Sequence, residues 1–451
     1  MLSCYIGGRV GRTLKSLREE HPVSEPRLDT APETTDATRT ETGTTDFAAA
    51  SAALDAADPL AAARDLFYSP DATQLSAYLD GNSLGRPLKA TATNLPRFVE
   101  DAWGSRLIRG WDEKWMDEPL AVGNRLGEVV LGAAPGQAFI GDSTSVLLYK
   151  MIRAAVDARP GRDEIIVDRD NFPTDRFIIE GIAAERNATI RWVETRPASG
   201  VRPEDLAELL TERTAVVVLS HVAYRSGFLA DAPAITAQVH DAGALMLWDL
   251  CHSVGSVPLD LDAWDVDLAV GCTYKYLNGG PGSPAFAYVN SALQGQLQQP
   301  IWGWMGAHDP FGMTDSYRPA DNLRRFITGT PPILAMQPLK DMVELIASVG
   351  MDAVRKKSVQ LTSYALELAD ALLVPLGAEV VSPRDAAERG SHITVDHPRF
   401  AEVTQLLWEH GVIPDFRPPH GLRIGLSPLS TGFAELEHGI RSIREVLLGL
   451  A

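Results

Sequence analysis

Two residues at the ends of neighbouring apolar runs have the chemistry needed to hold a pyridine cofactor. Asp249 follows the apolar run 245–248, and Lys275 follows the run 268–270, 26 residues after Asp249. An electron-sink cofactor with a pyridine ring needs a carboxylate at its ring nitrogen and a lysine that forms a Schiff base with its aldehyde. Adjacent strands would present both side chains to one site. The spacing therefore predicts binding of pyridoxal phosphate (PLP).

Each of these residues also has an ordinary structural interpretation. Most lysines lie on the surface, and aspartate is favoured as the N-cap of a helix that follows a strand. The apolar run before Lys275 and the glycine-rich segment 279–282 after it favour the chemical interpretation. Burial there would lower the pKa of the amine, which a nucleophilic lysine requires. We therefore expect Lys275 to be the catalytic lysine and Asp249 to face the ring nitrogen.

The bulk composition excludes several classes of function. The chain has 451 residues, of which 45% are hydrophobic, and a formal net charge of −18. Such a charge argues against nucleic acid or an anionic membrane as a general partner, because both attract basic surfaces. We expect no membrane helix, since no apolar stretch approaches the roughly 20 residues that one needs. Three cysteines without CxxC spacing argue against disulfides and zinc and favour the reducing cytoplasm.

The pattern of apolar runs predicts an α/β fold. Short apolar runs that alternate with helical stretches indicate a mostly parallel central sheet with helices on both faces. The runs of the large domain are 165–167, 190–193, 215–219, 245–248 and 268–270, and those of a smaller C-terminal α/β domain are 392–395 and 421–426. We expect a disordered tail (1–46), an N-terminal segment packing with the small domain (47–110), a large PLP-binding domain (111–338) and the small domain (339–451).

Polar residues gather where these predicted strands end. In open α/β sheets, ligands bind at the carboxyl ends of the strands. Ser220 and His221 follow the run 215–219, His252 comes soon after Asp249, and Tyr274 precedes Lys275. The segment 171–175 follows the run 165–167 in the same way. We expect one site at this edge of the sheet.

Four further candidate groups each also have an ordinary structural explanation. Thr144 and Ser145, at the start of a predicted helix, suit a phosphate, although simple N-capping gives the same pattern. Phe172 could stack on the pyridine ring, with Asp175 nearby, or belong to the core. His252 could be a core histidine. Arg423 could bind a substrate carboxylate through two hydrogen bonds, and Arg417 is the alternative candidate. Either arginine could instead form a surface ion pair. The sequence contains no HxH or HExxH spacing, so we expect no metal site.

With these residues assembled, the chain resembles the kynureninase family from about Leu54 to the C-terminus. A lysine motif alone would indicate only the class V aminotransferase superfamily, whereas the joint set of motifs is more specific. The matching segments are 78–85 (YLDGNSLG), 172–175 (FPTD), 274–278 (YKYLN, preceded by Thr273 in place of Ser), 303–306 (GWMG) and 331–333 (PPI). Leu147 departs from an Asn often found in that family.

The resemblance implies PLP fold type I and a homodimer with shared active sites. It implies that Trp304 and Thr330 reach the phosphate from the neighbouring subunit. Arg423 would bind the substrate carboxylate, and Ser83 would lie over the substrate. The remaining cofactor contacts that it implies are Thr144, Ser145, Phe172, Asp175, Ser220, Asp249, His252, Tyr274 and Lys275.

The resemblance also implies a reaction, hydrolytic Cβ–Cγ cleavage of L-kynurenine to anthranilate and L-alanine. Lys275, Asp249 and Tyr274 would be the catalytic residues. Trp111, Gly329 and Thr330 together are similar to members that prefer kynurenine over 3-hydroxykynurenine. The alternatives are an aminotransferase or a cysteine desulfurase on the same fold, or an inactive scaffold. A desulfurase needs a mobile cysteine in a late loop, and the last cysteine here is Cys272. Whether the reaction serves tryptophan catabolism or NAD biosynthesis is left open.

Overall fold

The computed structural model describes residues 46–71, 73–196 and 198–450. Residues 46–450 belong to one compact unit. The segment predicted to be a disordered tail lies outside the described residues except for Asp46. The Asp46 side chain accepts a hydrogen bond from the backbone N–H of Ala49 at 3.1 Å, so it caps helix α1 (Phe47–Ala56).

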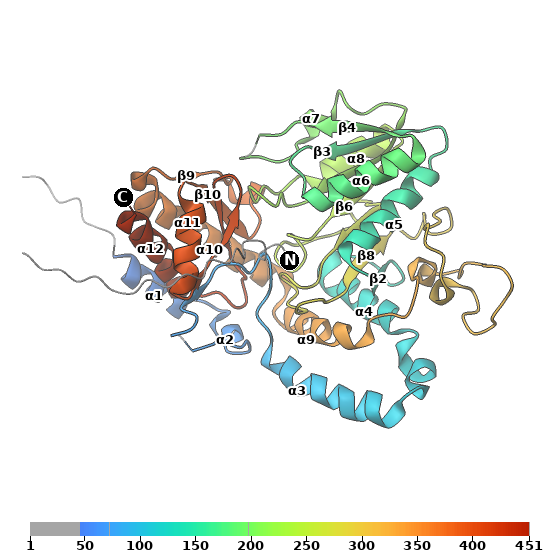
Figure 1. Cartoon of the computed structure of the whole chain (residues 1–451), viewed down its shortest axis with the longest axis horizontal. Helices are drawn as coiled ribbons and strands as arrows, with labels where there is room; N and C mark the ends of the chain where they lie inside the picture. The colour runs from blue at the N-terminus through green and yellow to red at the C-terminus, as the bar shows by residue number, and fades with distance from the viewer. Residues whose placement is uncertain (1–45, 72, 197, 451) are drawn as a thin grey trace, which may run out of the picture. The chain divides into compact units, whose positions relative to one another are not determined.

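A seven-stranded sheet carries the larger part of the unit (Figure 1). The strand order is β2-β8-β7-β6-β5-β3-β4. Strands β3 to β7 run parallel, whereas β8 is antiparallel to both of its neighbours. The bounds are β2 (Ala138–Gly141), β3 (Glu164–Asp168), β4 (Thr189–Val193), β5 (Thr214–Ser220), β6 (Leu245–Asp249), β7 (Leu268–Gly271) and β8 (Ala285–Val289). The five predicted runs of the large domain are the five parallel strands, and the mostly parallel α/β sheet is confirmed.

Helices cover both faces of this sheet, as the alternation along β5 illustrates. Val216 and Val218 pack into a core with α5 (Thr144–Asp157) and α6 (Pro173–Arg186). Val217 and Leu219 point the other way, into a second core that they share with three other helices. These are α4 (Glu118–Leu126), α8 (Ala232–Asp241) and α9 (Ile333–Val349). Because both faces are buried there, β5 is apolar from Ala215 to Leu219. Strand β4 at the edge of the sheet is less buried and contains Arg191.

A second, four-stranded antiparallel sheet belongs to the C-terminal part, in the order β12-β13-β10-β9. It shares a core with α10, α11 and α12 and with Ala77 and Leu79 from the N-terminal segment. Strand β1 (Ala77–Tyr78) pairs in parallel with β11 (Val412–Ile413), and Asp80 bridges to Gly425 at the end of β13. The turn that follows β1 is therefore held against this sheet. The bounds are β9 (Glu379–Val380), β10 (His392–Asp396), β12 (Asp415–Arg417), β13 (Gly421–Gly425), α10 (Met351–Leu372), α11 (Phe400–Glu409) and α12 (Phe433–Gly449).

The other helical segments are short or lie in connections. Their bounds are α2 (Ala61–Arg64), α3 (Lys89–Arg97), η1 (Phe98–Gly104), η2 (Trp111–Trp115), η3 (Gly127–Leu131), α7 (Pro203–Leu206), η4 (Trp304–Gly306), η5 (Leu323–Phe326), η6 (Val374–Leu376) and η7 (Ala386–Glu388).

One helical stretch among the described residues differs from the expectation that no segment is apolar enough to span a membrane. The stretch Met351–Leu376 is long and apolar enough to span a membrane, and 44% of its most apolar 18 residues are buried inside the protein. Leu361, Ala365 and Leu368 have no exposed surface and pack in the C-terminal core. The apolar character of this stretch is therefore explained by core packing.

Candidate active site

The carboxyl ends of the parallel strands carry a cavity of about 80 Å³ that contains the predicted lysine. Eight of the predicted cofactor residues line it together, although they come from four separate segments of the sequence. The lining consists of Thr144, Ser145, Leu148, Phe172, Thr174, Asp175, Asp249, Cys251, His252, Tyr274 and Lys275. The expectation of one site at this edge of the sheet agrees with this arrangement.

Lys275 has a specific partner in the cavity. Its Nζ lies 3.1 Å from Nε2 of His252. Burial, and then the charge of Lys275, hold the pKa of His252 well below its usual range. The imidazole is therefore neutral at physiological pH, and Nε2 accepts the hydrogen bond from the amine. His252 is thus a cavity residue that holds the amine of Lys275.

Two carboxyl groups, those of Asp175 and Asp249, line the cavity together. Asp249 accepts a hydrogen bond from the backbone N–H of Cys251 at 2.9 Å and another from the Ser220 hydroxyl at 3.4 Å. Burial and the neighbouring Asp249 raise the pKa of Asp175 well above its usual range. Among the described residues, the buried Oδ2 of Asp175 has no hydrogen-bond partner. An N–H-bearing cation between these carboxyls would satisfy that oxygen, which fits the protonated ring nitrogen of PLP.

Helix α5 begins at the mouth of the same cavity. The Ser143 side chain caps it by accepting from the N–H of Val146 at 3.4 Å, and Thr144 and Ser145 form its first turn. The free N–H groups and positive dipole end of a 14-residue helix favour an anion there. Capping and phosphate binding are both possible at this turn, because they use different donors.

Phe172 supplies an aromatic wall to the cavity. It is the N-cap residue of α6, and its ring packs edge-on against Tyr224 at a centroid distance of 5.5 Å. Since this contact uses one edge of the ring, a face is left to stack on a planar ligand. Ser220 differs from the expectation of direct contact: it does not line the cavity, and its hydroxyl instead contacts Asn171 at 2.7 Å and Asp249.

Arg423 is placed by β13 next to Ser83. It is fully buried, donates to Ser83 Oγ at 3.2 Å and to the carbonyl of Tyr224 at 2.8 Å, and pairs with Asp415. Arg417, the rival candidate, donates to the same carboxylate oxygen of Asp415 at 2.8 Å. The arginines therefore share one acid, and Arg423 is the more deeply buried of the two.

Two acidic residues near Arg417 and Arg423 were not predicted from the sequence. Asp415 pairs with both arginines. Burial and Asp415 raise the pKa of Asp80 to about 7, with Ser83 and Arg423 opposing them. The alternation of β12, which puts Asp415 and Arg417 on one face of the strand, could have indicated Asp415. Asp80 stands in the quoted turn motif, but its sequence neighbours do not reveal that Asp415 acts on its pKa.

Besides Ser220, Ser83 and Arg423, four further predicted residues do not line the cavity of this chain. Trp111 packs edge-on against Trp115 at 5.5 Å, and Trp304 is 43% exposed beside Phe311. Thr330 is exposed, and a Cβ added to Gly329 would meet nothing within 4 Å. A direct role for these residues within one chain is therefore not supported.

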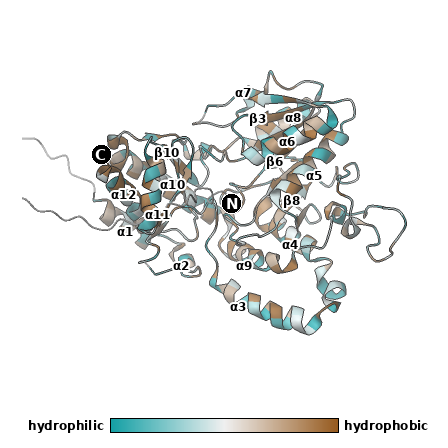
Figure 2. Ribbon diagram, viewed as in Figure 1, coloured by the Kyte–Doolittle hydropathy of each residue, from teal (hydrophilic) through white to brown (hydrophobic). Residues whose placement is uncertain are grey.

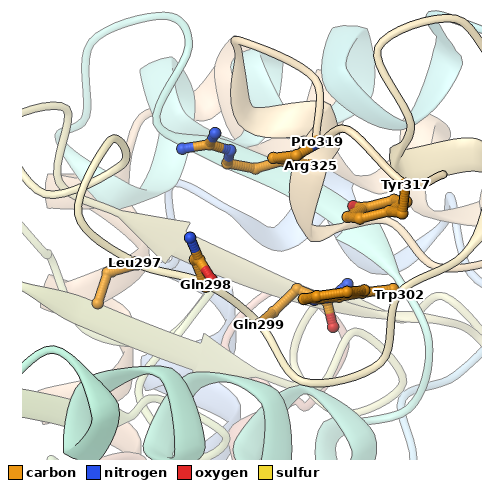
Figure 3. A pocket seen from close by; sticks show the side chains of 7 residues that line it. All are labelled: Leu297, Gln298, Gln299, Trp302, Tyr317, Pro319 and Arg325. Atoms are coloured by element: carbon orange, nitrogen blue, oxygen red, sulfur yellow. The ribbon is translucent and has the colours of Figure 1, made fainter.

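The connection that carries Trp304 has a cavity of its own, of about 190 Å³. Figure 3 shows the stacked rings of Trp302 and Tyr317 on one side of it and Arg325 on the other. The ring centroids are 5.1 Å apart, which leaves no room for a third ring between them. No predicted site residue lines this cavity.

Two cysteines lie next to the lysine segment, and one of them, Cys251, also lines the cavity. The backbone N–H of Cys272 donates to Sγ of Cys251 at 3.2 Å, and both thiols are free and buried. Cys4 lies outside the described residues. Because both described cysteines are buried, the desulfurase alternative gains no support. The described part of the chain holds no cluster of three or more metal-ligating side chains.

Comparisons with known proteins identify the family of the chain. The class V aminotransferase family model matches residues 143–413. The chain is 40% identical to kynureninases of Burkholderia pseudomallei and Pseudomonas fluorescens, over 88% of this chain and 94% of each relative. Among solved structures, it is similar to the apo cysteine desulfurase of Thermococcus onnurineus (16% identity, TM-score 0.72, 83% and 95% of the two chains). It is also similar to a C-DES mutant with glycine covalently linked to its PLP cofactor (17% identity, TM-score 0.71, 84% and 100%). The structural neighbours establish the fold alone. The family model and the sequence relatives show that the chain belongs to the PLP-dependent kynureninase family of the class V aminotransferase superfamily.

Proposed function

We propose that this protein hydrolyses the Cβ–Cγ bond of L-kynurenine to give anthranilate and L-alanine. The observation that carries the proposal is the single cavity in which Lys275, the acid pair Asp175 and Asp249, and the wall residue Phe172 meet. The kynureninases to which the chain is 40% identical add the substrate to that chemistry. We also propose that kynurenine is preferred over 3-hydroxykynurenine, on the basis of Trp111, Gly329 and Thr330.

PLP is the cofactor of this site. Thr144 and Ser145 would hold its phosphate at the start of α5, Phe172 would stack on its ring, and Asp249 would accept from its ring nitrogen. Bound there, PLP supplies an electron sink for charge that develops on the substrate carbons.

The chain's own residues move the protons. The Lys275 amine takes the proton from the substrate Cα, and neutral His252 holds that amine 3.1 Å from its Nε2. Cys272, burial and other nearby groups raise the pKa of Tyr274 far above its usual range, so its phenol stays protonated and can donate a proton. Tyr274 carries out the proton transfers at the substrate carbonyl, to which water adds.

Arg423 binds the substrate carboxylate, with Ser83 beside it. Its fork already contacts Asp415, Ser83 and Tyr224, so it is held rigidly before the substrate arrives. This rigidity reduces the entropy lost on binding and fixes the Cα near Lys275.

We further propose a homodimer in which Trp304 and Thr330 complete the partner's site. Large exposed apolar residues gather in two segments of the chain, and the apolar bands along the helical segment after α3 are visible in Figure 2. Such patches are typical of protein interfaces. The exposed residues are Val99, Trp103, Leu107 and Ile108 in one segment and Ile301, Trp302, Trp304, Phe311 and Met313 in the other.

A direct assay tests the reaction. The purified holoenzyme is incubated with L-kynurenine, and the fluorescence of anthranilate and the amount of L-alanine are followed. The Lys275→Ala variant should lose both turnover and the visible absorbance of the bound cofactor. Transfer of the amino group to an added oxo-acid without anthranilate would contradict the proposal and favour the aminotransferase alternative.

Mixing two inactive variants tests the shared site. Lys275→Ala and Trp304→Ala chains, unfolded and refolded together, should regain about one quarter of wild-type activity, because each mixed dimer has one intact site. Mixtures that remain as inactive as the separate variants, in a preparation that light scattering shows to be dimeric, would contradict site sharing.

A further inference from the structure

A cavity of about 590 Å³ opens at His221, the residue that follows β5. The proposed reaction uses no residue of its lining. Its volume falls within the range of 300–1,000 Å³ that is usual for small-molecule sites. Successive side chains of a strand point to opposite faces, so Ser220 faces Asp249 while His221 faces this second cavity.

The backbone of His221 is fixed on both sides. Its N–H donates to the carbonyl of Asp249, and its carbonyl accepts from the N–H of Ala230, both at 2.9 Å. The ring lies edge-on between Trp248 and Trp264, with each centroid 5.7 Å away. Its Nδ1 is buried and no described residue hydrogen-bonds to it, so Nε2 is the ring nitrogen left to face the cavity. Burial lowers the pKa of this imidazole to about 3, so the ring is neutral and keeps one nitrogen as an acceptor.

The walls and the rim of the cavity have different characters. Buried Val201, Phe228 and Val257 form apolar walls with the half-buried ring of Trp264. The rim carries Arg202 and three acids. Arg202 forms a two-pronged pair with Glu388, at 2.7 and 2.8 Å, while Glu204 and Asp231 add two further negative charges. Arg355 lies outside the lining but lowers the pKa of His221. With Arg355 included, the net charge around the cavity is still negative.

We propose that this cavity is a second ligand site, for a planar aromatic molecule that carries an N–H donor and no negative charge. The flat apolar walls accept the ring, the acceptor nitrogen of His221 takes the N–H, and the acidic rim disfavours anions. The site is coupled to the cofactor site because His221 donates its backbone N–H to Asp249, whose side chain lines that site.

Indole is the probe for this site, since it has one N–H and cannot form a Schiff base with the cofactor. Calorimetric titration of the holoenzyme should show saturable binding. Indene, which lacks the N–H, and indole-3-carboxylate, which is an anion, should each bind at least about fivefold more weakly. Because binding is measured without turnover, its failure and the failure of the proposed reaction can be told apart.

Matched variants locate the binding. Ala387→Trp fills the rim of the cavity from an exposed position and should abolish binding, whereas Ala263→Trp makes the same change at an exposed position outside the lining and should not. His221→Phe keeps the packing between the two tryptophans and should remove the preference for indole over indene. Saturating indole should change kcat/KM for kynurenine in the wild type and not in Ala387→Trp. Absence of saturable binding, or equal binding to Ala387→Trp, would overturn the site, and an unchanged kcat/KM would overturn the coupling.

Discussion

Lys275 Nζ and His252 Nε2 lie 3.1 Å apart in a cavity where the pKa of His252 is held well below its usual range by burial and by Lys275. A neutral imidazole accepts from the amine without competing for its proton. This pair therefore positions the group that must approach the substrate, and it is the first contact that a variant should probe.

Replacement of His252 should lower kcat more than it changes KM. We expect His252→Phe to lose the acceptor and to reduce kcat by roughly 10²-fold, a usual size for a misplaced general base. His252→Gln retains an amide oxygen as acceptor and should recover part of the loss. Steady-state kinetics of both variants measure this, and equal losses in the two would argue that the ring only fills space.

Replacement of Arg423 by lysine tests the carboxylate clamp. Arg423→Lys keeps the charge and loses the fork, so KM should rise roughly tenfold or more while kcat changes less. Arg417→Lys is the matched control, because Arg417 shares Asp415 but is less buried. A larger rise of KM in Arg417→Lys than in Arg423→Lys would reassign the clamp.

The raised pKa of Asp80 predicts a pH dependence of stability. Burial and Asp415 raise this pKa to about 7, above its value in the unfolded chain, so between about pH 4 and pH 7 the folded state binds more protons. The contribution of Asp80 to the free energy of unfolding therefore falls as pH rises through this window. Denaturant unfolding at pH 5 and pH 8 should show a smaller difference in Asp80→Asn than in the wild type. An identical difference would place the titration elsewhere.

Gly85 should not tolerate a side chain. Its N–H donates to the carbonyl of Tyr274 at 2.8 Å, and an added Cβ would lie 2.4 Å from the carbonyl oxygen of Lys275. Gly85→Ala would displace the lysine segment and should lower kcat by roughly 10²-fold, with weaker PLP retention in dialysis. Gly181→Ala in α6 meets nothing within 4 Å and should leave activity unchanged while stabilising the helix by about 0.5–1 kcal/mol.

A buried ion pair anchors the N-terminal segment to helix α10. Lys357 pairs with Asp58, and the side chains are 2% and 1% exposed. Lys357→Met leaves Asp58 buried without its partner, which should cost about 3–5 kcal/mol of the free energy of unfolding. The double variant with Asp58→Leu should recover most of this loss in denaturant titrations. A single variant as stable as the wild type would mean that Asp58 reaches water.

The sequence by itself predicted the parallel strands, which the structure confirms, and a set of candidate cofactor residues, eight of which line one cavity. Apolar runs with polar residues at their ends are local signals, and the sheet brings those ends to one edge whatever else the chain does. Asp249, His252, Tyr274 and Lys275 could therefore be assigned from two short segments. Strands β2 and β8 were not predicted although they are as long as β3, β4, β6 and β7. They pair with each other antiparallel, and β8 follows β7 without a helix between them, so it falls outside the alternation of strands and helices.

Only the tertiary structure decided the contacts between distant segments. Arg423 and Ser83 stand 340 residues apart, and no local pattern specifies that they meet. The neutral state of His252 and the raised pKa of Asp80 likewise depend on burial and on charges from other elements, which periodicity does not encode. Trp304 and Thr330 stand outside the cavity of their own chain, which their local motifs do not reveal. The local pattern of side chains predicted the cofactor chemistry. The packing of remote segments determines which groups lie beside Arg423 and how the pKa values of His252 and Asp80 are shifted.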